Sequence, residues 1–588
     1  MRHSSGITPQ PHTVTAAEVV PGDLLALAEQ DIAEHTWYVV MRTVPEGPES
    51  IRLTLRPPLG GTDHDEVVAR SRRVTVAGHR TDVAAVPLVT SSDLARTSLC
   101  DGDRVTSLRA VDPRAQEETY VRRWGVWHRD LENPSERPLT DEELRKLAED
   151  AARRGHLVRH HPRPLRPSRG AAARRVVVTG LGAVTPLGVG VPELWEGLVQ
   201  GRCGIRELAD EEFAGLPVRV AGTVPVDPVG LLPGPQARRM NRAAQFGVLA
   251  AREAWQDAGF STAGTVESGL DPERVGVSVG AILGDASILV GGDRKLRDKG
   301  PRAVSPLTTP MTVPSQAASQ ISLDLGITGE ARTVTSACAS GTEAIGQAID
   351  RIRYGHVDLA LAGGAEAVVT PAIMASFASM RALSAHGVGD VSPSRPFAKD
   401  RDGFVNGEGA GFLLLEAEEH ARARGARIYC EAAGWGLSAD AHHMAAPDPS
   451  GSGIALALRR ALRDADAHAV DVVHVNAHAT ATSDGDLAEA TALRAVLGGA
   501  VPVTALKGHL GHLQGAAGGV EAVATVLTLH HGVIPPTIGG SEQDPEIRLD
   551  VVRGTPRPLP SAGDLALSNS FGFGGHNAVL ALRRTSMA

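Results

Sequence analysis

Short stretches of alternating apolar and polar residues, separated by Gly, Pro and Asp, fill the first part of the chain. The segments TWYVVMRTV, SIRLTLRPP and SRRVTVAGH are rich in β-branched residues and predict strands of a small barrel or sandwich. Farther along, Thr140 is a suitable helix N-cap, and apolar residues recur with the spacing of one helix face from Leu144 to Ala151. We therefore expect a β-rich or α+β domain over residues 13–155, after a disordered N-terminus over residues 1–12.

A change in composition ends this region. Residues 156–173, HLVRHHPRPLRPSRGAAA, are rich in Arg, Pro and His and have no apolar period, which predicts a solvated linker. After it the chain begins RVVVTGLGAVTPLG, a continuous apolar strand that we expect to end in a Gly-rich turn. Buried strands then alternate with amphipathic helices to the C-terminus, among them VGVSVGAI, DLALAGGAE, GFLLLE, DVVHVNAHA and NAVLALR. This alternation predicts one large α/β unit over residues 174–588.

Composition and charge exclude several classes of protein. The 588 residues suffice for about two to four domains, and 42% hydrophobic with 22% charged residues is ordinary for a globular protein. A formal net charge of -9 provides no basic surface for nucleic acid. The four cysteines show no CxxC spacing, and no apolar run reaches the roughly 18 residues of a membrane span. We expect a soluble cytoplasmic protein without a disulfide framework.

The most specific chemical feature is Cys338 in VTSACASGTEAIGQAIDRIRYG, where a β-rich run ends and an amphipathic helix begins. Unpaired N–H groups and the dipole at a helix N-terminus favour a thiolate, so we expect a lowered thiol pKa. A lone cysteine before a helix is more often structural than catalytic, and the assignment therefore requires partners. Candidate partners are His478 in VNAHATATSDGD, and Lys507, His512 and Glu521 in ALKGHLGHLQGAAGGVEA.

These segments resemble the elongating, synthase II-like β-ketoacyl-acyl carrier protein synthases. TSACASG is similar to the family's nucleophile elbow, NAHATAT to its first histidine motif, and KGHLGHLQGAAG to its lysine and second histidine motif. RPFAKDRDGFVNGEGAG and the glycine-rich gate NSFGFGGHN also match, in the family's order, over residues about 175–584. The resemblance implies an α/β, thiolase-like fold of two similar halves, about 174–424 and 425–588, with layered helices and mixed sheets.

The resemblance also implies how the reaction is carried out, a decarboxylative Claisen condensation with a malonyl-acyl carrier protein. Cys338 would hold the acyl group, and His478 and His512 would stabilise the enolate by donating hydrogen bonds. Lys507 would orient a histidine or a carboxylate, and Glu521 would hold this lysine in an ionised network.

Further residues are implied at the substrate. Backbone N–H groups of Cys338 and Phe573 would form the oxyanion hole. Thr480 and Thr482 resemble the family's hydroxyl contacts to the phosphopantetheine arm, and Phe404 and Phe573 its aromatic lining of the pocket mouth. Ala479 departs from the family, because a glycine usually stands there.

The expected partners are an acyl carrier protein and a second copy of the chain, with a heterodimer left open. No metal or cofactor is expected. The GLG of TGLGAV lacks the third glycine of a dinucleotide fingerprint, and the adjacent His442 and His443 would point to opposite faces of a strand.

Two other functions stay open. A chain-length partner subunit of a polyketide synthase would replace the nucleophile, typically by Gln, whereas this chain has Cys338. A CoA-dependent thiolase-type enzyme would have a second cysteine where this chain has NSFGFGGHN. The sequence does not distinguish fatty-acid from polyketide synthesis, nor does it assign the N-terminal domain a function.

Overall fold

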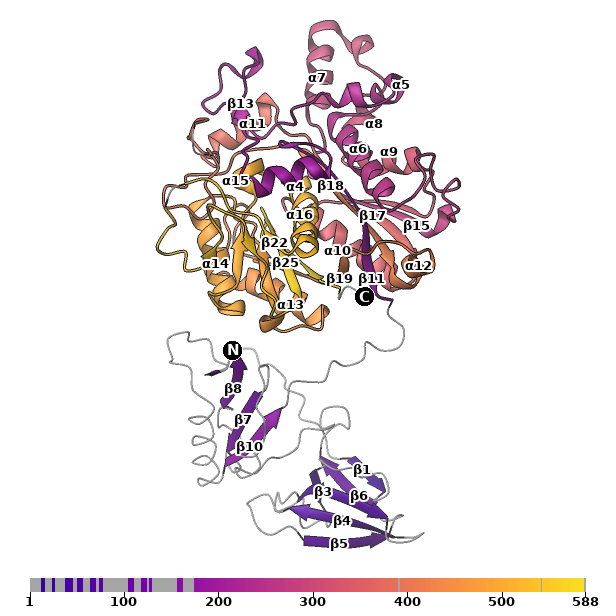
Figure 1. The fold of residues 1–588 in the computed structure, drawn as a ribbon, viewed down its shortest axis with the longest axis vertical. Coiled ribbons are helices and arrows are strands. Elements are labelled where there is room, and N and C mark those ends of the chain that lie inside the picture. Colours follow the sequence, from indigo (N-terminus) through magenta and orange to yellow (C-terminus); the bar gives the residue numbers. More distant parts are fainter. Residues whose placement is uncertain are drawn as a thin grey trace. The chain divides into compact units, whose positions relative to one another are not determined.

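The computed structural model divides the chain into two units, Met1–Arg166 and Pro167–Ala588 (Figure 1). The structure describes residues 174–389, 392–540 and 542–585 in full, and the strands β1 to β10 in the first unit. Each unit is described by itself below.

The strands of the first unit form two antiparallel sheets, in the orders β1-β6-β2-β3-β4-β5 and β10-β7-β8-β9. Their bounds are His12–Thr15 (β1), Leu24–Ala26 (β2), Tyr38–Pro45 (β3), Ser50–Arg56 (β4), His64–Ala69 (β5), Arg73–Ala77 (β6), Arg104–Arg109 (β7), Glu118–Arg123 (β8), Val126–Arg129 (β9) and His156–His161 (β10). The three strands predicted from the sequence are confirmed as β3, β4 and β6. The first residues assigned to the linker instead form β10, and the helix predicted after Thr140 lies outside the described residues.

One mixed sheet organises the second unit, in the order β16-β15-β17-β18-β11-β19-β26-β25-β20-β21-β23. Its strands are Val176–Thr185 (β11), Val275–Gly280 (β15), Glu330–Val334 (β16), Leu359–Glu366 (β17), Gly409–Ala417 (β18), Cys430–Ala439 (β19), Val472–Asn476 (β20), Pro502–Thr504 (β21), Asp550–Val551 (β23), Leu565–Gly572 (β25) and His576–Arg583 (β26). From β16 to β11, three parallel strands precede two antiparallel ones, and from β21 to β19 the same sequence of pairings recurs. The prediction of two similar halves is therefore confirmed.

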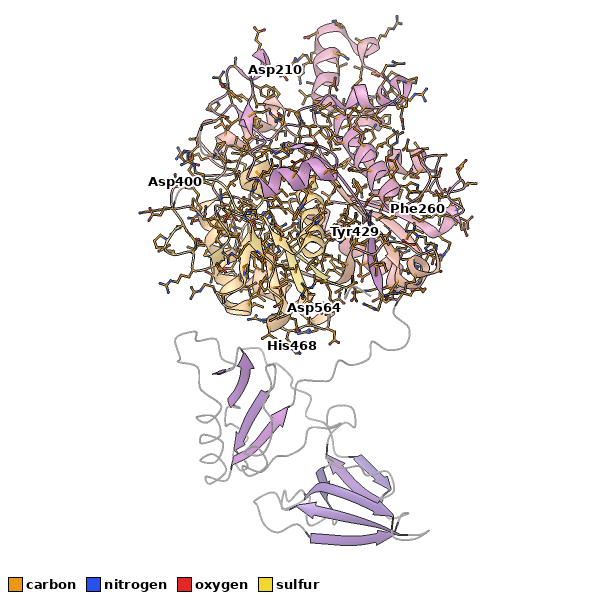
Figure 2. The ribbon with its side chains drawn as sticks, in the orientation of Figure 1. Asp210, Phe260, Asp400, Tyr429, His468 and Asp564 are labelled. Atoms are coloured by element: carbon orange, nitrogen blue, oxygen red, sulfur yellow. The ribbon has the colours of Figure 1, made fainter. Side chains whose placement is uncertain are left out.

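Helices cover both halves of this sheet in layers. The central pair is α10 (Ser340–Arg353) and α16 (Ala517–His531), whose buried side chains share one core with strands of both halves. Outside the first half lie α6 (Arg242–Asp257) and α9 (Gln316–Leu325), and outside the second lie α13 (Ser452–Asp464) and α14 (Ser483–Leu497). Side chains fill the spaces between these layers (Figure 2).

The remaining helices are shorter or lie at the periphery. They are α4 (Val191–Val199), α5 (Gly234–Ala237), α7 (Ser287–Lys299), α8 (Thr308–Thr312), α11 (Pro371–Ser379), α12 (Glu418–Ala423) and α15 (Lys507–Leu510). None of the helices in the described residues has both the length and the apolar character of a bilayer-spanning segment.

The sequence-based prediction was wrong at the start of this unit, where β11 continues through the expected Gly-rich turn. A Cβ atom on Gly182 would lie 1.9 Å from the carbonyl oxygen of Ala250 in α6, and one on Gly180 would lie 2.0 Å from that of Ala254. The glycines therefore let the α6 backbone pack directly on the strand, a close approach that no other residue permits.

We predict that Gly182→Ala lowers the free energy of unfolding of the second unit by about 2–3 kcal/mol, because the added methyl overlaps the helix backbone. Denaturant unfolding followed by tryptophan fluorescence measures the loss. Gly215→Ala is the matched control, since a Cβ there meets nothing within 4 Å. Equal stability of the two variants would contradict the packing argument.

Candidate active site

Cys338 lies in the tight turn that joins β16 to α10. Its side chain is buried, with 6% of the residue exposed, and Ala337 before it has a φ of 50°. The backbone N–H groups of Cys338 itself and of Phe573 face Sγ and act to lower the pKa of its thiol. Gly572 permits this approach, because a Cβ there would lie 2.9 Å from the backbone nitrogen of Cys338.

The structure overturns the expectation of a lowered thiol pKa. Burial raises the pKa of the Cys338 thiol to about 12, and Glu366 adds to the rise. The charge of Lys507 and the two N–H groups act in the opposite direction but do not compensate for the lost hydration. In the unliganded protein Cys338 is therefore a thiol.

Two buried histidines face each other near this cysteine. His478 follows β20 and His512 follows α15, and their ring centroids lie 5.4 Å apart at an interplanar angle of 84°. The ring of Phe404 lies edge-on to His512 at 5.6 Å, and Phe571 lies 5.7 Å from His478. Burial, together with the nearby charge of Lys507, holds the pKa of both imidazoles well below the usual range, so both are neutral.

Lys507 determines the tautomer of His478. Its Nζ donates to Oε1 of Glu521 and to the carbonyl oxygen of His478, both at 2.5 Å, and lies 3.3 Å from Nδ1 of the His478 ring. Because an ammonium group only donates, Nδ1 accepts, and the imidazole proton is on Nε2. Burial raises the pKa of Glu521 to about 7, against the lowering effect of Lys507.

His512 is open to a ligand. Neither of its ring nitrogens has a hydrogen-bond partner within the described part of the chain, although only 2% of the residue is exposed. Buried polar atoms normally have partners, so these two nitrogens are available to a bound molecule. The backbone of His512 is fixed, because its N–H donates to the carbonyl oxygen of Val405 at 2.7 Å and its carbonyl accepts from Gly407 at 2.9 Å.

The other predicted residues lie at the edges of this cluster. The hydroxyls of Thr480 and Thr482 are 3.1 Å apart in the partly buried loop before α14. Phe404 is buried, whereas Phe573 is 37% exposed in the turn between β25 and β26. The structure thus joins His478, His512, Lys507, Glu521 and Phe404 in one cluster, and Lys507 and Phe573 act on Cys338, whereas the two threonines are engaged with each other.

The loop that carries His478 is held by a residue the sequence analysis missed. Glu489 of α14 is buried and accepts from the N–H groups of His478 at 2.9 Å and Ala479 at 2.8 Å, and from Asn569 at 2.9 Å. Ala479 has a φ of 26°, in the region that favours glycine. A signal existed: Asp486 and Glu489 lie three residues apart in DLAEATAL, the spacing of one helix face, and both are buried in α14.

No group of three or more His, Cys, Asp or Glu side chains is placed to hold a metal in the described residues. His442 and His443 were expected on a strand, but they lie exposed in the loop after β19, where Nδ1 of His443 accepts from the N–H groups of Ala445 and Ala446.

Comparison with known proteins agrees with this arrangement. A model of the family described as beta-ketoacyl synthase, N-terminal domain, matches residues 173–421, and a model of the beta-ketoacyl synthase C-terminal domain matches residues 429–541. The chain belongs to the β-ketoacyl synthase family. The matched regions contain Cys338 in the first and both histidines with Lys507 in the second.

Two bacterial relatives match this synthase over nearly the whole of their own length. The 3-oxoacyl-[acyl-carrier-protein] synthase 2 of Synechocystis sp. is 41% identical over 415 residues, which cover 70% of this chain and 98% of the relative. The enzyme of the same name from Vibrio cholerae is 40% identical over 416 residues, covering 70% and 99%. The synthase II-like, acyltransferase assignment made from the motifs is confirmed.

Solved structures confirm the thiolase-like fold. The ishigamide ketosynthase/chain length factor matches with a TM-score of 0.65 and 38% identity, covering 71% of this chain and 100% of that one. A β-ketoacyl synthase from Burkholderia phymatum matches with a TM-score of 0.63 and 35% identity, covering 70% and 100%.

For this synthase we predict that the alkylation rate of Cys338 by iodoacetamide keeps rising from neutral to alkaline pH without a plateau, because burial raises the thiol pKa. Peptide mass spectrometry resolves Cys338 from the exposed Cys203, which serves as the internal reference. A plateau near neutral pH would show that the helix terminus outweighs burial after all.

Proposed function

We propose that this chain catalyses the decarboxylative condensation of an acyl group on Cys338 with malonyl-acyl carrier protein, giving a β-ketoacyl-acyl carrier protein. The observation that carries the proposal is the convergence of a thiol faced by two backbone N–H groups with two neutral, buried imidazoles. Fatty-acid and polyketide synthesis both use this reaction.

Acyl transfer is the first step. Sγ of Cys338 attacks the carbonyl carbon of the acyl thioester, and the N–H groups of Cys338 and Phe573 donate to the oxygen that becomes negative. The intermediate collapses by breaking the bond to the carrier sulfur. The proton lost from the Cys338 thiol ends on that sulfur, so the free carrier thiol leaves.

Condensation follows on the malonyl thioester. Loss of CO₂ leaves the bonding electrons in an enolate, whose oxygen accepts hydrogen bonds from His478 and His512. Nε2–H of His478 is the available donor, since Lys507 occupies the side of Nδ1. The enolate carbon then attacks the acyl carbonyl, and the bond to Sγ breaks. Cys338 leaves as a thiolate and takes up a proton from solvent.

The alternatives lack support at this site. A chain-length subunit needs no nucleophile, whereas this chain buries Cys338 beneath two N–H donors and beside Lys507. The thiolase-type alternative requires a second cysteine near the C-terminal motif, where Phe573 and Gly574 stand instead.

The partners follow from the same proposal. The carrier protein presents both thioesters, and a ketosynthase structure that matches this chain at a TM-score of 0.64 and 32% identity was solved with its acyl-carrier protein. We also propose a homodimer. The strand β16 is one of the two outer strands of the mixed sheet, and such an edge offers unpaired backbone groups to a second copy.

Cys338→Ala should abolish acyl loading, because it removes the thiol that the two N–H groups face, and the other described cysteines, Cys203 and Cys430, lie elsewhere. Intact-mass measurement after incubation with a panel of acyl-acyl carrier proteins tests this and identifies the acyl chain retained by the wild type. Cys203→Ala, which removes an exposed thiol, should load normally. Stoichiometric acylation of the Cys338→Ala variant would refute the assignment.

His478→Ala and His512→Ala should still load acyl groups but should condense about 10²–10³-fold more slowly, since each removes one donor to the enolate. Single-turnover product formation from the loaded enzyme separates the two steps. His531→Ala, at the exposed end of α16, is the matched control. If both histidine variants lost acyl loading as completely as Cys338→Ala, the assignment of the histidines to the condensation step alone would be wrong.

We further propose that the domain over residues 13–155 is dispensable for the chemistry, because every residue of the proposed site lies after residue 173. A chain that begins at Arg174 should load and condense a short acyl substrate, since a unit of this size buries its own core. Sedimentation equilibrium checks that it is dimeric. Dimeric, truncated protein that loads Cys338 yet forms no product with any carrier protein would place the domain in the reaction.

A further inference from the structure

Gln514 contacts the proposed nucleophile, although the sequence analysis assigned it no role within the segment KGHLGHLQGAAG. The residue is 4% exposed, and its Oε1 accepts a hydrogen bond from the Cys338 thiol, with 3.6 Å between Sγ and the oxygen. Its φ is 53°, which is unfavourable for a side chain of this kind. Backbone strain of this type persists where the surroundings hold the residue, and it clusters at functional sites.

A chain of hydrogen bonds fixes which end of the Gln514 amide faces the sulfur. Nδ2 of the buried Asn406 donates to the carbonyl oxygen of Val368 at 3.1 Å. A carbonyl only accepts, so the other end of the Asn406 amide, Oδ1, must face Gln514, where Nε2 donates to it at 3.0 Å. Oε1 is therefore the atom left to face Sγ.

An oxygen in this position distinguishes the states of Cys338. It accepts a hydrogen bond from the thiol, but it has nothing to accept from a thiolate or from a thioester, and its partial negative charge opposes a thiolate. The N–H groups of Cys338 and Phe573 have the opposite preference, as does Lys507. Gln514 thus acts in the same direction as burial, since both favour the thiol form of Cys338 before substrate binds.

We propose that Gln514 is a positioning residue: its Oε1 accepts a hydrogen bond from the Cys338 thiol and so keeps the sulfur protonated and slow to react. This hydrogen bond is broken when the thiol reacts with a bound acyl thioester. The role deepens the proposed function, since it rests on Cys338 as the nucleophile. Gln514 does not take the proton, because an amide is not a base at neutral pH. During acyl transfer the proton leaves Sγ for the departing carrier thiol, and the hydrogen bond to Oε1 is lost.

Other charges near Cys338 are common to every variant considered. Lys507 of α15 lowers the thiol pKa, and Glu366 at the end of β17 raises it. Burial raises the pKa of Glu366 itself to about 7, so its ionisation contributes to each profile in the same range. Differences among Gln514 variants therefore report on the amide.

The test is the pH profile of Cys338 alkylation by iodoacetamide, resolved by peptide mass spectrometry. Gln514→Leu and Gln514→Met remove the acceptor at similar volume, and we expect their profiles to shift to lower pH, with a rate at neutral pH about three- to tenfold above the wild type. Gln514→Glu places a charge at the same point, so its profile should shift to higher pH with a slower rate.

Two controls separate this effect from loss of structure. Alkylation of the exposed Cys203 should be the same in all variants. Gln245→Leu removes another buried glutamine, whose Nε2 donates to the carbonyl oxygens of Ala237 and Met240, and should leave the Cys338 profile unchanged. If Gln514→Leu alters the Cys203 rate, the methionine variant provides the result.

Opposite shifts for the apolar and the glutamate variants support the proposal. Coincident profiles, or shifts in the same direction, overturn it, because a side chain that only fills space does not respond to the sign of its charge. The proposed function is tested separately by acyl loading of the wild type and of Cys338→Ala. If the wild type failed to load acyl groups while the Gln514 variants still showed opposite alkylation shifts, the proposed function would be rejected and the role of Gln514 would stand.

Discussion

The site depends on one buried cation. Lys507 is 2% exposed, and its ammonium group is satisfied by Glu521 and by the backbone and ring of His478. Removing one partner of a buried ion pair commonly costs about 3–5 kcal/mol, because the remaining charge stays out of water. Lys507 therefore fixes the tautomer of His478, adds to the effect of burial that keeps both imidazoles neutral, and lowers the pKa of the Cys338 thiol.

Burial of the site separates the roles of its groups. The same low dielectric raises the pKa of the Cys338 thiol and lowers that of both histidines, so the free enzyme holds a thiol beside two neutral imidazoles. A neutral imidazole has one N–H group. It can donate a hydrogen bond to an enolate oxygen without protonating the enolate. Lys507 and the two backbone N–H groups favour negative charge at the sulfur. The N–H groups are fixed by the backbone, so they would need no reorganisation when an oxyanion forms in the proposed reaction.

Small residues and strained backbone make this packing possible. The aromatic share of the chain is only 3%, and glycines such as Gly182 and Gly572 let backbones approach where a methyl group would overlap. Several residues in the turns around the site have positive φ without being glycine, namely Ala337, Phe397, Ala479, Ala481 and Gln514. Buried acceptors hold two of these turns, since Glu489 accepts from Ala479 and Asp486 accepts from Ala481 and Phe397.

The sequence by itself determined the strands with continuous apolar runs, the helix after Cys338, and the family to which the candidate site residues belong. These are local patterns, and ordered motifs such as TSACASG and KGHLGHLQGAAG carry their chemistry in adjacent positions. Only the tertiary structure decided the course of β11 through its glycines, the pKa of Cys338 and the contact of Gln514 with Sγ. Each of these depends on groups 68 to 235 residues away, such as Ala250 for Gly182 and Phe573 for Cys338. The spacing of residues along the sequence does not show how far distant segments remove water from a side chain. For this reason the helix N-terminus predicted a thiolate at Cys338, whereas burial keeps the group a thiol.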